Sequence, residues 1–239
     1  IKRLTDGAAL QKARIHPIAI LAALMTYKSG HSVKGDGVWT PVSTIVDALD
    51  EAFYESFKHV KPTGKRVMLA LDVSSSMTCG FIAGVPGLTP RIASAAMAMV
   101  IARTEKNHMF VGFSSGKKGE WTHGVGKSMW SGYKAGISTI DISPRMRLDT
   151  VISEIQKIPM GGTDCALPML YAKAKGIDVD GFVVLTDSET WAGDIHPSQA
   201  LKDYRKKSGI PAKSVVVGMV ANGFTIADPA DGGMMDVVG

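Results

Sequence analysis

The sequence has few of the features of a secreted or membrane-bound protein. It contains only two cysteines, Cys79 and Cys165, which is too few for the disulfide framework of a small secreted domain. No apolar run approaches the roughly 20 residues that cross a bilayer. The first fifteen residues carry five charges in place of the apolar stretch of a signal peptide. We therefore expect two free thiols, a cytoplasmic location and no membrane partner.

A zinc site of the usual kind is also excluded by what is missing. The six histidines are never three or four residues apart, and no C-x-x-C occurs. The net charge is a mild +5, which permits an anionic partner without requiring one. A hydrophobic fraction of 45% in 239 residues supports a sizeable core, either of one large domain or of a domain with an appendage. Because the chain begins at Ile1, we expect it to be part of a longer protein.

The first quarter of the chain is predicted to be helical. Residues 16–30 and 40–60 each read as a helix, and Thr40 and Pro41 fit the N-cap and first position of the second one. Residues 61–65 read as a turn or linker, and no strand is predicted before them. A short helical segment therefore precedes the rest of the chain.

After residue 65 the pattern alternates between strands and helices. Apolar runs without polar alternation are typical of strands that are covered on both faces, as in a parallel sheet. The fold class predicted is α/β, with a doubly wound, mostly parallel sheet and helices on both faces. The strands expected are 66–72, 108–114, 181–187 and 213–221, and the helices expected are 89–107, 143–158 and 197–209. Residues 160–176 are expected to form a Gly-Gly turn followed by a helix, and residues 115–136 to form loops or an edge hairpin.

Three loops carry oxygen-bearing side chains. Asp72, Ser74 and Ser76 follow the first strand, Thr163 lies in a G-G-T-D turn, and Asp187 ends another apolar strand. Taken singly, each has a plain structural explanation, as a turn, a helix N-cap or a strand-end residue. Taken together, they offer two carboxylates and three hydroxyls at strand ends of one sheet. Such ligands suit a hard cation: Mg²⁺, Mn²⁺ or Ca²⁺.

These three loops resemble the metal-ion-dependent adhesion site of von Willebrand factor A domains. That motif combines D-x-S-x-S, a Thr and an Asp around Mg²⁺ or Mn²⁺. The resemblance implies that the hydroxyls bind the cation directly, that the carboxylates often act through water, and that a partner protein supplies an acidic group to the last position. One departure is Ser75, where the family usually has Gly. A serine there would be strained if the loop required a positive φ.

Residues 15–80 extend the resemblance to the Ro (TROVE) ribonucleoprotein family, in a bacterial form. In that family a ring of HEAT-type helical repeats binds RNA, and a von Willebrand A domain closes the ring. The resemblance implies that residues 1–62 are the end of the ring and its junction, and that 63–239 are the A-like domain. It also implies that the full-length parent binds Y RNA and misfolded noncoding RNA in RNA quality control.

Two other functions compete with this interpretation. Phosphatases of the haloacid dehalogenase type also place an Asp after a buried strand, but they need a second carboxylate where this chain has Ser74. An extracellular adhesion module uses the same fold, but sparse cysteine and the absent signal peptide oppose it. We therefore expect a protein that is not an enzyme. The basic stretches 116–121 and 204–209 are either solvated surface or contacts to phosphate.

Overall fold

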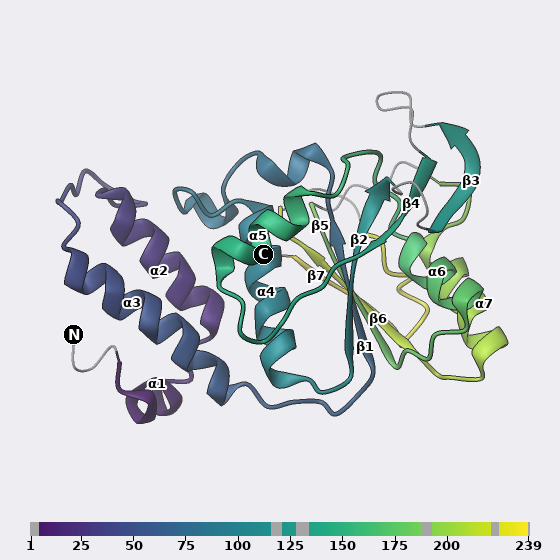
Figure 1. The fold of residues 1–239 in the computed structure, drawn as a ribbon, viewed down its shortest axis with the longest axis horizontal. Coiled ribbons are helices and arrows are strands. Elements are labelled where there is room, and N and C mark those ends of the chain that lie inside the picture. The colour runs from purple at the N-terminus through teal and green to yellow at the C-terminus, as the bar shows by residue number, and fades with distance from the viewer. Residues whose placement is uncertain (1–4, 116–120, 128–133, 188–192, 221–224, 239) are drawn as a thin grey trace.

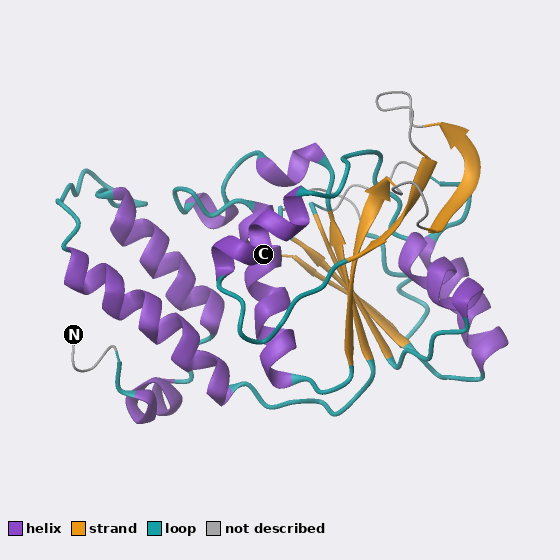
Figure 2. Ribbon diagram, viewed as in Figure 1, coloured by secondary structure: helices purple, strands orange, loops and turns teal. Residues whose placement is uncertain are grey.

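The computed structural model describes residues 5–115, 121–127, 134–187, 193–220 and 225–238. A sheet of seven strands lies at the centre, with helices on both faces and a group of three helices beside one layer (Figures 1 and 2). In the part of the chain that the structure describes, no helix is long and apolar enough to span a membrane. The predicted α/β fold class is confirmed.

The sheet is built around its first strand. The strand order is β3-β4-β2-β1-β5-β6-β7. All pairings among β2, β1, β5, β6 and β7 are parallel, whereas β3 and β4 add an antiparallel edge. The strands are β1 (Val67–Asp72), β2 (His108–Ser115), β3 (Trp121–Lys127), β4 (Lys134–Thr139), β5 (Gly181–Thr186), β6 (Lys213–Gly218) and β7 (Met234–Val238).

Two hydrophobic cores flank the sheet, one on each face. Leu69 and Leu71 of β1 face the core under α4 and α5, while Met68 and Ala70 face the core under α6 and α7. This explains why the strand has no polar alternation: both its faces are covered. The covering helices are α4 (Pro90–Thr104), α5 (Leu148–Gln156), α6 (Leu167–Lys175) and α7 (Pro197–Ser208), with the short turns η2 (Ser75–Thr78) and η3 (Ile82–Gly84).

The helical segment packs directly on the α4 side. It comprises α1 (Gly7–Ala13), α2 (Pro17–Ser29), α3 (Ser43–Ser56) and the short turn η1 (Phe57–His59). Phe53 and Phe57 belong to the same core cluster as β1. The Arg103 guanidinium of α4 lies 4.7 Å from the ring centre of Tyr54 and 4.9 Å from that of Phe57. The segment and the sheet layer therefore share one core.

The structure corrects several predicted boundaries. Helix α3 begins at Ser43, its N-cap is Val42, and Thr40 and Pro41 lie before it. No side chain caps this helix, and the amide of its N-cap residue, Val42, donates a hydrogen bond to the Tyr27 hydroxyl. Helix α5 starts at Leu148 and not at residue 143.

Two elements were not predicted, helix α1 and the edge strand β7. Residues 115–136 include parts of an edge hairpin, β3 and β4, as one of the two alternatives proposed. Of the basic stretch 116–121, only Trp121 lies within the described residues.

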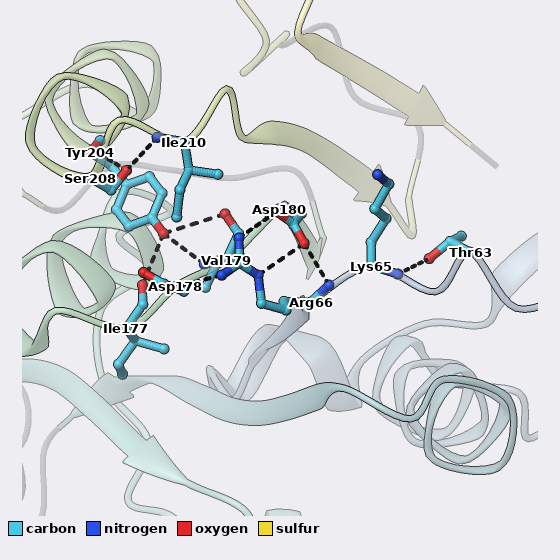
Figure 3. A network of polar contacts seen from close by, with 10 residues as sticks. All are labelled: Thr63, Lys65, Arg66, Ile177, Asp178, Val179, Asp180, Tyr204, Ser208 and Ile210. Atoms are coloured by element: carbon cyan, nitrogen blue, oxygen red, sulfur yellow. Dashed lines mark hydrogen bonds and ion pairs between the residues drawn. The ribbon is translucent and has the colours of Figure 1, made fainter.

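A polar network joins the N-terminal edge of the sheet to α7 (Figure 3). Tyr204 is fully buried, and its ring packs edge-on against Phe182. Its hydroxyl accepts a hydrogen bond from the Val179 amide at 2.7 Å and donates one to the Ile177 carbonyl at 2.9 Å. This single side chain thus satisfies backbone groups just before β5.

We expect Tyr204→Phe to lower the free energy of unfolding by about 1–2 kcal/mol, because it leaves a buried amide and a carbonyl without their partner. Tyr171→Phe is the matched control, since its half-buried ring packs on Trp121 and its hydroxyl makes no hydrogen bond to the described residues. Urea unfolding measures both. Equal losses would contradict a structural role for the Tyr204 hydroxyl.

Candidate metal centre

The candidate centre lies at the C-terminal edge of the two central strands. Strands β1 and β5 are parallel neighbours, so Asp72 at the end of β1 and Asp187 just after β5 emerge at the same edge. In open α/β sheets this edge is where ligands bind. The predicted placement of both carboxylates at strand ends is what the structure shows.

The loop after β1 turns back on its own aspartate. Asp72 Oδ1 accepts a hydrogen bond from the Ser74 amide at 2.8 Å, and the Ser74 and Ser76 hydroxyls lie 2.9 Å apart. Ser74 is buried, whereas Ser76 is exposed. The alternate spacing of these three residues therefore brings three oxygen-bearing groups together.

Asp72 is a carboxylate in the interior, only 1% exposed. The Thr186 hydroxyl donates to its Oδ2 at 2.8 Å. Burial raises the pKa of Asp72 to about 6, and the charge of Asp187 adds to that rise. The hydrogen bonds from Ser74 and Thr186 act in the opposite direction, but desolvation outweighs them. A cation at this edge would reverse the balance.

Ser75 causes no strain in this loop. It begins the short helical turn η2, and the non-glycine residues with positive φ in the described chain are only Arg14 and Ala83. Its side chain is exposed, and its carbonyl accepts a hydrogen bond from the Thr78 hydroxyl at 2.6 Å. The conformation here does not require the glycine that the family usually has.

Thr163 and Asp187 are both buried, at 2% and 7% exposed. Thr163 is not a helix cap, because α6 begins four residues later at Leu167. Asp187 is close enough to Asp72 for its charge to act on the pKa of that group. Among the described residues, no hydrogen bond links Thr163 to the other four predicted ligands.

A buried arginine beneath the loop was not predicted from the sequence. Arg91, in α4, is 4% exposed, and its Nη2 donates to the carbonyls of Ser74 at 3.1 Å and Val73 at 3.4 Å. Burial lowers the pKa of Arg91, and the charge of Asp72 partly restores it. An arginine in the first turn of an Ala- and Met-rich helix was the available signal, since a charge on such a helix is buried only where it has partners. Arg91 holds the loop backbone and offsets the charge of Asp72.

Asp164, beside Thr163, was also missed. It is 3% exposed, its Oδ1 accepts a hydrogen bond from the Ala166 amide at 2.9 Å, and burial raises its pKa to about 6. Its carboxylate lies against Gly193, which has φ of +98°, so a larger residue at position 193 would collide with it. The G-G-T-D turn thus contributes a buried carboxylate as well as the predicted hydroxyl.

The donor set fits a hard divalent cation. All the predicted side chains offer oxygen, which Mg²⁺, Mn²⁺ and Ca²⁺ prefer. In the described ranges, no group of three or more His, Cys, Asp or Glu side chains is arranged to hold a metal. Zinc-type chemistry is therefore not indicated by these residues, and a cation here would depend on hydroxyls with two carboxylates.

The two cysteines flank these loops without a disulfide between them. Cys79 is exposed and Cys165 is buried. The expectation of two thiols agrees with this.

A family model described as the Ro60 vWA domain matches residues 66–239. The chain belongs to the Ro60 von Willebrand A domain family. The resemblance read from the D-V-S-S-S, G-G-T-D and L-T-D-S loops is therefore confirmed at the level of the family.

Members of the Ro60 family are similar over the whole chain. RNA-binding protein RO60 of Deinococcus radiodurans is 46% identical over 239 residues, which is 100% of this chain and 41% of that protein. RNA-binding protein RO60 of Caenorhabditis elegans is 37% identical and is matched over 34% of its length. The crystal structure of the Deinococcus radiodurans RO (RSR) protein superposes with a TM-score of 0.83 at 45% identity, over 98% of this chain and 43% of that one. The chain thus spans less than half the length of these Ro60 relatives.

The raised pKa of Asp72 predicts a specific dependence of stability on pH. In the folded protein this pKa is about 6, against 3.8 ordinarily, so the folded state holds the proton more tightly than the unfolded state does. Its contribution to stability is therefore complete below pH 4 and is lost as the pH rises towards and past 6, by up to about 3 kcal/mol. In metal-free protein, Asp72→Asn should flatten this decline.

Urea unfolding at pH 4, 5, 6 and 7 with EDTA measures the effect. Asp164 contributes in the same direction, so the variant keeps part of the slope. Asp36→Asn, on an exposed loop, is the control and should retain the wild-type profile. An unchanged slope in Asp72→Asn would contradict the assignment.

Proposed function

We propose that this chain is a divalent-cation-binding module of an RNA-binding protein, and not an enzyme. The observation that carries the cation is the buried, doubly hydrogen-bonded Asp72 beside Ser74 and Ser76 at the C-terminal edge of β1. The ligand set is Asp72, Ser74, Ser76, Thr163 and Asp187, with Mg²⁺ preferred over Mn²⁺ and Ca²⁺. These oxygen atoms would hold the cation, and water would fill any coordination position that they and a partner leave open.

The surroundings of the loop support a site of modest affinity that accepts one further ligand. Arg91 holds the loop carbonyls, so the backbone is already ordered before a cation arrives. Its positive charge also opposes the cation, and only two carboxylates are in the set. We infer that an acidic side chain of a partner protein occupies the last coordination position, because an incoming carboxylate supplies the missing negative charge.

The RNA function is proposed for the longer protein of which this chain is a part. Both relatives described above are named RNA-binding proteins, and each is more than twice as long as this chain. We propose that the whole protein binds Y RNA and misfolded noncoding RNA in the cytoplasm. Residues 1–62 would be the end of a helical-repeat region, and 63–239 the von Willebrand A domain, which the match from residue 66 supports.

The first prediction from this proposal concerns the cation. Titration calorimetry with Mg²⁺ or Mn²⁺ at pH 7.5 should give one site per chain, because the five proposed ligands form a single set. Asp72→Ala should abolish it, since the variant removes the central carboxylate. Ser75→Gly is the matched control in the same loop, and it should bind as the wild type does, because Ser75 is exposed and unstrained.

Undiminished binding by a folded Asp72→Ala variant would overturn the site. Binding below pH 6 should also weaken, since the cation and the proton compete for the same carboxylate. If a peptide carboxylate completes the shell, acidic peptides should tighten Mg²⁺ binding in the wild type and in Ser75→Gly alike.

The second prediction concerns hydrolysis. We expect no turnover of p-nitrophenyl phosphate with Mg²⁺, because Ser74 occupies the position where a haloacid-dehalogenase phosphatase needs its acid/base carboxylate. Both oxygens of Asp72 are also engaged, by the Ser74 amide and the Thr186 hydroxyl. Turnover that disappears in Asp72→Asn would establish the enzyme alternative instead.

A further inference from the structure

The edge of the sheet opposite the candidate metal centre is rich in lysine. The register places His108, Val67, Gly181 and Lys213 side by side at the start of four parallel strands. Lysines stand at or just before three of these starts, and more lie at the ends of the helices that run back to this edge. The exposed lysines are Lys61, Lys65, Lys106, Lys175, Lys206, Lys207 and Lys213.

The carboxylates at this edge are fewer than the lysines and already have partners. Arg66 contacts Asp178 and Asp180 at 2.7 Å (Figure 3), and Glu105 accepts hydrogen bonds from the backbone amides of residues 63 and 64. Lys173 is paired with Asp203. None of the seven exposed lysines makes a salt bridge within the described ranges, although the charges of Lys65 and Lys206 act at longer range on Asp180 and Asp203. The edge therefore keeps a net positive charge.

Helix dipoles account for only part of this accumulation. Lys175, Lys206 and Lys207 lie in or at the last turns of α6 and α7, where a positive charge complements the helix dipole. Lys106 also follows directly on the C-cap of α4, Glu105, so it too complements a helix dipole. Lys65 and Lys213 lie at the starts of β1 and β6, which β5 separates, and the net dipole of strands is small.

The surface beneath the lysines is shallow and continuous. One depression of about 190 Å³ is lined by Arg66, Asn107 and His108, among others. A second, of about 120 Å³, is lined by Lys173, Lys207 and Ser208, among others. Both are also lined by Ile177 and Asp178, so they form one strip across the edge.

We propose that this lysine edge binds the phosphate backbone of RNA. The inference rests on the proposed RNA function and names the surface that would serve it in this chain. Lysines are point charges suited to phosphate, and such contacts carry no sequence information. An anionic membrane fits less well, because membrane-binding surfaces combine basic with apolar side chains. The exposed large apolar residues belong elsewhere: to the helical segment, to loops near the candidate metal centre, and to β7.

The test replaces the three lysines that lie at or just before strand starts. Lys65→Gln, Lys106→Gln and Lys213→Gln are combined in one variant. Lys12→Gln, Lys28→Gln and Lys34→Gln form the matched control, since these are also exposed, lie in the helical segment, and remove the same charge. Anisotropy with a labelled 20-nucleotide uridine strand gives the affinity of this chain from 50 to 200 mM salt.

The edge variant should lose affinity at low salt, and its dependence on salt should become shallower by about 2 log units per tenfold change. That figure is about 0.7 for each of three lost contacts to a single strand. The control variant should change by less than half as much. Ser75→Gly should bind the strand as the wild type does, since this exposed residue lies at the other edge.

Equal changes in the edge and control variants would overturn the proposal, because binding would then follow net charge alone. Loss of binding to phosphatidylserine vesicles with RNA binding unchanged would overturn it in favour of a membrane surface. The longer protein separates this proposal from the RNA function. If the longer protein binds RNA equally tightly with and without the three substitutions, the lysine edge is not the RNA-binding surface and the proposed RNA function stands. If the longer protein binds RNA neither with nor without the substitutions, the proposed RNA function is wrong.

Discussion

The burial of one carboxylate at the end of the central strand organises this domain. Asp72 is almost wholly removed from water, and an unpaired buried charge is costly. The chain offsets the cost with a backbone amide, a threonine hydroxyl from the adjacent strand, and the buried arginine beneath the loop. These contacts come from β1, β5 and α4, so the elements that form the core also fix the candidate site.

The same balance bears on how the proposed cation would bind. The pKa of Asp72 is still raised despite its hydrogen bonds, because desolvation outweighs them. Without a cation, the ionised carboxylate therefore lowers the free energy of unfolding near neutral pH. A divalent ion would offset this cost, and the positive charge of Arg91 would weaken its binding. Such an arrangement would favour reversible binding over a permanent structural metal.

The sequence was informative where local chemistry decides the structure. An unbroken apolar run predicted a strand covered on both faces, and β1 has that form. The strand-end aspartates were found because a carboxylate after such a run needs an explanation. Tertiary contacts were not visible in this way. Helix α3 begins beyond Thr40, and the amide of Val42 before it is held by Tyr27, fifteen residues away. Arg91 is explained only by the loop that it meets. Strand β7 was missed because its largely exposed residues carry no buried pattern.

The two ends of β1 have opposite chemistry, and the strand sets the distance between them. It begins beside Lys65 and Arg66 and ends at Asp72. Six residues at about 3.3 Å each place these ends about 20 Å apart. Because the strand is hydrogen-bonded on both sides in the middle of the sheet, its length is fixed. Ligands at its two ends would therefore neither clash nor compete. The fold thus permits an RNA and an acidic protein partner to be held at once, each by its own chemistry.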